Sequence, residues 1–291
     1  MSCDSPGELT PDTSGAPIVP DLVPPDPSFM TPAWADALSG HEMGLYRRVL
    51  GLPWQPDVKA AVLEDLKEDF ALDVEDWVNR VSDGLDRQGQ EHRVDDSTGA
   101  TIAGFPVDSL EARAFALLWR SYLQATGGVY PTPVIVSRAM RPPSLAPRCL
   151  DLGSGIGDMA QLLLALGYTV DVADVSPQLV QFARWRVARR GQELHFINLR
   201  EEDLTEGGYD TIIVKDVLAN VSRPRNIIPK IRTALRHDGV IIANIQRDPP
   251  SISRNNVGKL DESNVHESVI RDNFMLIEHI DEFIAMYARA H

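Results

Sequence analysis

Cysteine is scarce in this chain, because Cys3 and Cys149 are the only two among 291 residues. We therefore expect no disulfide framework, which suits a reducing compartment. The sequence also lacks an apolar run of about 18–20 residues, the length that spans a bilayer. Its N-terminus has no basic stretch followed by an apolar one, the pattern of a secretory signal. We expect a cytoplasmic protein with no membrane partner.

Several kinds of catalytic site are missing as well. No G-x-S-x-G nucleophile elbow is present, and no Gly-Lys-Ser/Thr of a P-loop follows the glycine-rich segment of the chain. The histidines show neither H-x-x-x-H nor H-x-H spacing, so we expect no metal site. They are His41, His92, His195, His237, His266, His279 and His291.

Positive charge is in deficit: 28 Lys and Arg face 42 Asp and Glu, which gives a net charge of −14. Such a chain repels nucleic-acid phosphates, so we expect no nucleic-acid partner and instead a small-molecule substrate. One run, Arg184–Arg190, is basic, but it falls on a predicted helix. We interpret it as a solvent-exposed helix face. The sequence does not define an oligomeric state.

The chain divides into three predicted parts. Residues 1–30 are rich in Pro, Asp, Ser and Gly and are predicted to be a disordered tail, or a flap that orders over a ligand. Residues 31–133 are mainly helical in pattern and form a predicted cap or lid, with apolar stripes at 74–85 and 110–122. Residues 134–291 alternate short β-branched runs with helical segments, the pattern of a parallel α/β domain.

The last part is predicted to have a Rossmann-like, doubly wound α/β fold. Its seven-stranded sheet is mostly parallel, with one antiparallel strand, because the last two strands are joined by only Asp281–Phe283. Strands are predicted at 148–152, 169–174, 194–198, 209–215, 240–246, 274–280 and 284–289. Helices are predicted near 157–166, 177–190, 224–236 and 262–271.

A glycine-rich loop, Asp151-Leu-Gly-Ser-Gly-Ile-Gly157, runs from the first of these strands into a helix. Glycines here let the backbone turn sharply and approach a ligand. A dinucleotide fingerprint needs Gly or Ala one position later, where this chain has Asp158, so the spacing disfavours NAD and FAD. Asp174 ends the next strand, 23 residues after Asp151. An acid there can accept both hydroxyls of a ribose.

The loop, the following ADVSP segment and the stretch Tyr209–Asn220 together resemble the class I methyltransferases that depend on S-adenosylmethionine (SAM), in both order and spacing. The resemblance covers about half of the chain and implies SAM as cosubstrate. It implies that Gly153, Gly155 and Gly157 line the methionyl part, that Asp151 helps to hold its amino group, and that Asp174 holds the ribose. Val175 and Leu199 would lie near the adenine.

The segment after the fourth strand departs from the family pattern. Many relatives that act on small molecules have a Glu-His pair where this chain has Ala219-Asn220. Polar residues still gather there and after the fifth strand, at Lys215, Asp216, Asn220, Asn244 and Gln246. We predict that Lys215 contacts the cofactor and that Asp216 and Asn220 take part in catalysis, although Asp216 could also cap a turn.

Tyr130 lies in a Gly- and Pro-rich hinge, residues 127–133, between the predicted cap and the sheet domain. A lid would close over SAM at such a junction. Tyr130 is a predicted catalytic residue, which would face the sulfonium by cation–π attraction or orient an amine. The alternative is that it packs the cap onto the sheet.

Three functions are compatible with these features. The first is a SAM-dependent methyltransferase that acts on a small molecule, in specialised metabolism. The second is a SAM-cyclising enzyme that forms azetidine-2-carboxylate and releases methylthioadenosine, because some cap-bearing relatives catalyse that reaction. The third is a SAM-binding protein without catalysis.

Overall fold

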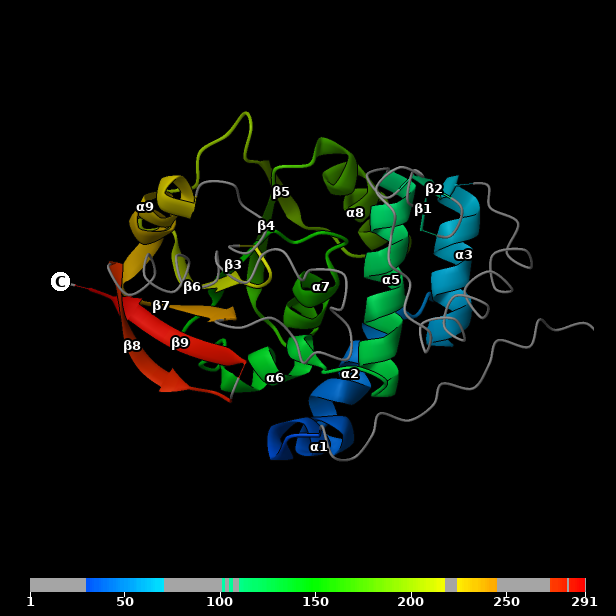
Figure 1. The fold of residues 1–291 in the computed structure, drawn as a ribbon, viewed down its shortest axis with the longest axis horizontal. Helices are drawn as coiled ribbons and strands as arrows, with labels where there is room; N and C mark the ends of the chain where they lie inside the picture. Colours follow the sequence, from blue (N-terminus) through cyan, green and yellow to red (C-terminus); the bar gives the residue numbers. More distant parts are fainter. Residues whose placement is uncertain are drawn as a thin grey trace, which may run out of the picture.

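The computed structural model describes residues 30–70, 101–102, 105–106, 110–217, 224–244, 273–281 and 283–290 (Figure 1). The predicted tail up to residue 29, the stripe at 74–85, the helix at 262–271, Asn220 and Gln246 lie outside these residues. None of the helices in the described ranges is both long and apolar enough to cross a bilayer.

The main sheet has seven strands in the order β5-β4-β3-β6-β7-β9-β8. They are β3 (Arg148–Leu152), β4 (Thr169–Asp174), β5 (His195–Asn198), β6 (Tyr209–Val214), β7 (Leu235–Asn244), β8 (Phe274–His279) and β9 (Ile284–Arg289). All neighbours from β5 to β7 pair in parallel, and β9 alone runs against both β7 and β8. The predicted fold class, including its single reversed strand, is confirmed.

Strand β7 begins earlier than predicted, at Leu235 rather than residue 240. Leu235 pairs with Tyr209, and the register then shifts so that Val240 pairs with Thr211. The polar residues between these two pairs are typical of a turn, which is why the sequence pattern placed the strand start too late.

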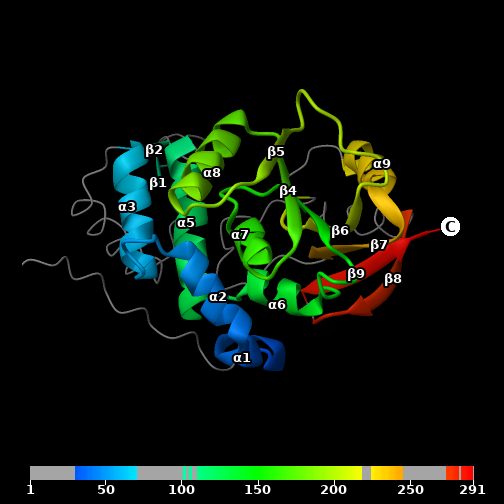
Figure 2. The same ribbon diagram turned by 180° about the vertical axis from the view of Figure 1, so that it is seen from behind.

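Helices cover both faces of the sheet (Figures 1 and 2). One core cluster joins Leu150 and Leu152 of β3 to Ile228 of α9 (Pro224–Ala234), while Cys149 lies in the other cluster with Leu163 of α7 (Asp158–Ala165). Successive strand residues point to opposite faces, so β3 serves both cores. Helix α8 (Pro177–Arg189) shares the face of α7.

The N-terminal helices pack directly on this layer. They are α1 (Pro32–Ser39), α2 (His41–Leu50), α3 (Val58–Phe70), α5 (Leu110–Thr126) and α6 (Thr132–Ala139), with a small hairpin of β1 (Thr101–Ile102) and β2 (Phe105–Pro106). Tyr46 of α2 belongs to the same buried cluster as Leu163 of α7. The predicted boundary at residue 133 falls within α6, and the division into a cap and a sheet domain stays a prediction.

The prediction that Arg184–Arg190 is a solvent-exposed face is wrong for three of its arginines. The side chains of Arg186, Arg189 and Arg190 are 0%, 10% and 3% exposed and surround the fully buried Asp65 of α3. Their nitrogens lie 2.7–3.0 Å from its carboxylate oxygens. The helix pattern of α8 gave no indication of this acid, because it lies about 120 residues earlier in the chain.

Candidate functional site

The loop between β3 and α7 has a backbone that glycine alone adopts easily. Gly153, Gly155 and Gly157 have φ angles of +72°, +54° and +75°, in the left-handed region. A Cβ atom on Gly153 would lie 2.3 Å from Cγ2 of Val217, and one on Gly155 would lie 3.1 Å from Cδ1 of Leu117. The loop is therefore closely enclosed, and larger residues would change its course.

Asp174, at the carboxyl end of β4, is fixed against this loop. Its Oδ2 accepts a hydrogen bond from the backbone N–H of Gly155 at 3.2 Å, and its Oδ1 accepts one from Ser176 at 2.8 Å. Each carboxylate oxygen keeps lone-pair capacity for a further donor. Val175 follows it with 57% of its surface exposed, so an acid and an open apolar surface lie next to each other.

Asp151, one residue before the end of β3, is a buried acid with an unsatisfied oxygen. Its residue is only 4% exposed, and its Oδ2 has no hydrogen-bond partner. Burial raises the pKa of Asp151 to about 7, helped by the negative charge of Asp158 and opposed by Lys215. A buried polar atom without a partner needs an explanation, and a cationic donor from a ligand would supply one.

Lys215 and Asp216 follow β6 at the same edge of the sheet. Asp216 has a φ of +55°, unusual for a residue other than glycine. Its N–H donates to Oδ1 of Asn244 at 2.8 Å, and Nδ2 of Asn244 donates back to its Oδ1 at 2.5 Å. This reciprocal pair joins the carboxyl ends of β6 and β7 and holds the Asp216 carboxylate in place.

Two cations lie beside that carboxylate. Oδ2 of Asp216 is 3.3 Å from Nη2 of Arg120 on α5 and 3.6 Å from Nζ of Lys215. Burial by itself would raise the pKa of Asp216, but Lys215 and Arg120 hold it below its ordinary value. Burial, reinforced by Arg120, lowers the pKa of Lys215. Asp216 is therefore an anion at neutral pH and a weak base.

Asp158 connects the glycine loop to the N-terminal helices. It is the first residue of α7, and its Oδ2 accepts hydrogen bonds from the hydroxyls of Tyr46 (2.9 Å) and Ser121 (2.8 Å). Although burial opposes ionisation, Lys215 and these hydroxyls hold the pKa of Asp158 below its ordinary value. A second link runs through Arg186, which donates to the carbonyl of Ile156 at 3.3 Å.

Tyr130 lies where the hinge meets the turn between β8 and β9. Its hydroxyl donates to Oδ2 of Asp281, and its ring makes edge contacts with Trp34 and Phe283 at centroid distances of 5.9 and 5.1 Å. The ring is 1% exposed. This environment matches the packing alternative, and the role of Tyr130 in catalysis stays a prediction.

The other predicted site residues are placed less directly. The backbone N–H of Leu199 donates to the carbonyl of Asp174 at 3.0 Å, so Leu199 lies beside the predicted ribose acid. Its side chain packs partly buried against the apolar core.

Some residues around the loop were not predicted from sequence. In the sequence, Asp158 served only as evidence against a dinucleotide fingerprint. An acid in the first turn of a helix is favoured by the helix dipole, and this signal could have singled out Asp158. Arg120, Tyr46 and Ser121 gave no sequence indication, because they reach the edge of the sheet only through the packing of α2 and α5.

These groups fit SAM. The unsatisfied oxygen of Asp151 suits the ammonium of its amino-acid half, and Asp174 beside exposed Val175 suits a ribose with an attached base. The close glycine backbone suits the chain between them. Among the described residues, no group of three or more His, Cys, Asp or Glu side chains is arranged to hold a metal ion.

Residues 150–241 match the family described as "Methyltransferase domain". The matched segment begins in β3, includes the glycine loop and ends in β7, so it covers about a third of the chain and falls on the Rossmann-like sheet. It is similar to two curated proteins named "Ubiquinone biosynthesis O-methyltransferase". The protein from Cereibacter sphaeroides is 28% identical over 114 residues, which cover 38% of this chain and 46% of that protein. The protein from Xanthomonas euvesicatoria is 29% identical over 115 residues, which cover 38% of this chain and 48% of that protein.

The match therefore spans about half the length of these curated relatives. Among solved structures, a TehB-like SAM-dependent methyltransferase from Corynebacterium glutamicum aligns over 60% of this chain and 96% of its own, with 17% identity and a TM-score of 0.44.

Proposed function

We propose that this chain transfers the methyl group of SAM to a small-molecule acceptor, which binds beside the carboxyl ends of β6 and β7. The observation that carries the proposal is the glycine loop, enclosed by Asp151 on one strand end and Asp174 on the next. In doubly wound sheets, ligands bind at the carboxyl ends of the strands. The family match supports the same reaction class.

Bound SAM supplies an electrophilic methyl group on its sulfonium. The chain contributes positioning: Asp151 accepts a hydrogen bond from the ammonium, and Asp174 accepts from the ribose hydroxyls. Lys215 balances the negative charges of Asp151, Asp158 and Asp216. Alignment of this kind supplies much of the rate enhancement in a transfer reaction.

Asp216 is placed to orient the acceptor. Its carboxylate is anchored by Asn244 and Arg120, so it offers a fixed hydrogen-bond acceptor at the end of β6. Because its pKa is held below the ordinary value, Asp216 is a weak base: it accepts a hydrogen bond from the acceptor hydroxyl and takes up that proton, for release to solvent, only as the methyl–oxygen bond forms and the sulfonium–methyl bond breaks. The catalytic role of Tyr130, whose hydroxyl donates to Asp281, stays a prediction. The role of Asn220 stays a prediction.

The acceptor that we propose to test first carries a hydroxyl group. Two curated relatives are named as O-methyltransferases, which makes oxygen the first acceptor atom to test. The net charge of −14, which repels nucleic-acid phosphates, favours a small molecule over a nucleic acid. Specialised metabolism stays a prediction from the resemblance.

The test is to incubate the full chain with SAM, with and without a panel of phenolic and amine acceptors, and to identify the nucleoside product. S-adenosylhomocysteine that forms only when an acceptor is present supports methyl transfer. Methylthioadenosine formed without any acceptor would instead indicate cyclisation of SAM. Binding of SAM without either product, across the panel, would favour a non-catalytic protein. Gly155→Val, which crowds Leu117, should abolish SAM binding and serves as the negative control.

A further inference from the structure

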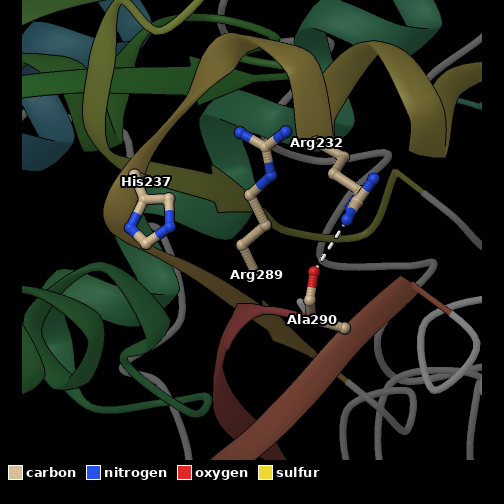
Figure 3. A pocket seen from close by; sticks show the side chains of 4 residues that line it. All are labelled: Arg232, His237, Arg289 and Ala290. Atoms are coloured by element: carbon tan, nitrogen blue, oxygen red, sulfur yellow. Dashed lines mark hydrogen bonds between the residues drawn. The ribbon is translucent and has the colours of Figure 1, made fainter.

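A hollow lies where α9, β7 and the end of β9 meet (Figure 3). Its volume is about 300 Å³, and it is lined by Arg232, His237, Arg289 and Ala290. Arg232 comes from the last turn of α9, His237 from the start of β7, and Arg289 from the end of the reversed strand β9. These positions coincide with the amino ends of the parallel strands, so the hollow is separate from the proposed SAM site.

Two of the lining cations, Arg232 and Arg289, form no ion pair with an acid among the described residues. The side chain of Arg289 makes no hydrogen bond or ion pair with any described residue, and the Arg232 side chain donates from Nη2 to the carbonyl of Ala290 at 2.7 Å. The Nε of Arg232 is buried and has no hydrogen-bond partner. A carbonyl is neutral, so the positive charge of these two guanidinium groups is left uncompensated within the described part of the chain.

Two acids that contact α9 and β7 pair with other cations, whereas Asp238, which follows His237 in β7, is an exposed acid. Asp210 lies 3.2 Å from Nη1 of Arg236, and Asp203 lies 2.6 Å from Nζ of Lys230. The chain as a whole has a net charge of −14, so two neighbouring arginines that pair with no described acid differ from the acidic average of the chain. The carboxyl end of α9 favours a cation there and accounts for Arg232. It does not account for Arg289, which comes from a different element.

We propose that this hollow binds a small anion of the phosphate type, either inorganic or as the phosphate group of a compact metabolite. Guanidinium groups present planar pairs of N–H donors that match phosphate oxygens, and Arg232 and Arg289 provide two such groups. The volume lies at the small end of ligand pockets, which disfavours a polymeric anion. The chain would thus have a second ligand site that is distinct from the SAM site.

The test is calorimetric titration of the full chain with pyrophosphate, inorganic phosphate and citrate, in chloride buffer at low ionic strength. We expect saturable binding of pyrophosphate that is tighter than binding of citrate. Arg289→Gln should weaken it about tenfold or more, because it removes a charge-assisted donor. Arg236→Gln is the matched control, since Arg236 is a nearby arginine that already pairs with Asp210. It should change the affinity by less than about twofold.

SAM affinity, measured on the same samples, should be unchanged by Arg289→Gln and reports correct folding. If that variant does not fold, Arg232→Gln provides the same comparison. The proposal is overturned if pyrophosphate does not bind saturably, if citrate binds at least as tightly, or if Arg236→Gln weakens binding as much as Arg289→Gln. None of these outcomes depends on whether the chain transfers a methyl group.

Discussion

Replacing Asp151 with asparagine should weaken SAM binding and remove much of its pH dependence. The Oδ2 of Asp151 is buried without a partner, so the ammonium of SAM would be its first cationic donor. Burial and the charge of Asp158 raise the pKa of Asp151 to about 7, which means that protonation competes with ligand binding just below neutral pH. Asparagine keeps the size of the side chain but has no charge to titrate.

The expected magnitude follows from that pKa. With the pKa at about 7, only about 3% of Asp151 is ionised at pH 5.5, so the affinity of the native chain should fall by up to about 30-fold from its plateau. The α-amino group of SAM loses its proton at about pH 8, so the affinity for SAM should decline again above that pH. At pH 7.5, Asp151→Asn should bind SAM about 10- to 100-fold more weakly, the typical worth of a charge-assisted hydrogen bond.

The stability of the ligand-free protein should change in the opposite direction. An unfolded aspartate titrates near about pH 3.9, so the folded pKa of Asp151 is raised above the unfolded value. The folded state then binds more protons, and this contribution to stability is present below about pH 4 and lost as the pH rises through about 7. Between these two pH values the free energy of unfolding should fall by at most about 4 kcal/mol on account of Asp151. Asp151→Asn avoids it and should be the more stable protein at pH 8.

Two measurements check this reasoning: calorimetric titration with SAM at pH 5.5, 6.5 and 7.5, and denaturant unfolding without ligand at pH 4 and pH 8. Asp171→Asn is the matched control, since Asp171 is an acid of β4 that already accepts a hydrogen bond from Tyr209 at 2.9 Å. It should leave the pH dependence of SAM binding intact. The reasoning is refuted if Asp151→Asn keeps the native pH dependence, or if it is less stable than the native chain at pH 8.

Two further substitutions test the loop and its support. Gly153→Ala places a Cβ atom 2.3 Å from Val217 at a φ of +72° and should reduce SAM affinity by more than tenfold. Gly191→Ala, at a φ of +67° with nothing within 4 Å, is the control and should leave SAM affinity unchanged in the same titration. Equal losses of SAM affinity in the two variants would contradict the assignment of the loop. Asp65→Asn leaves the buried arginines of α8 without their acid and should lower the free energy of unfolding by about 3–5 kcal/mol. Glu68→Gln, which removes a 52%-exposed partner of the same network, should lower it by less than about 1 kcal/mol in denaturant unfolding, and similar effects of the two variants would contradict a buried network.

The local spacing of residues was sufficient to predict the sheet and its glycine loop. The three glycines need left-handed backbone, and Asp174 ends the next strand, so both features follow from short segments whose geometry depends little on the rest of the chain. The reversed strand β9 followed from a connection too short for a parallel crossover. The ligand class, by contrast, followed from the family resemblance that the loop, the ADVSP segment and Tyr209–Asn220 carry together.

The tertiary structure decided what lies around that loop. The arginines of α8 have the sequence pattern of an exposed helix face, and only the fold packs Asp65 of α3 against them. Tyr130 likewise donates a hydrogen bond to Asp281, which lies 151 residues later in the chain. Asp158 receives the hydroxyls of Tyr46 and Ser121 only because α2 and α5 cross the start of α7. Burial and charge pairing between distant segments have no local pattern in the chain, so they became visible only when the fold brought those segments together.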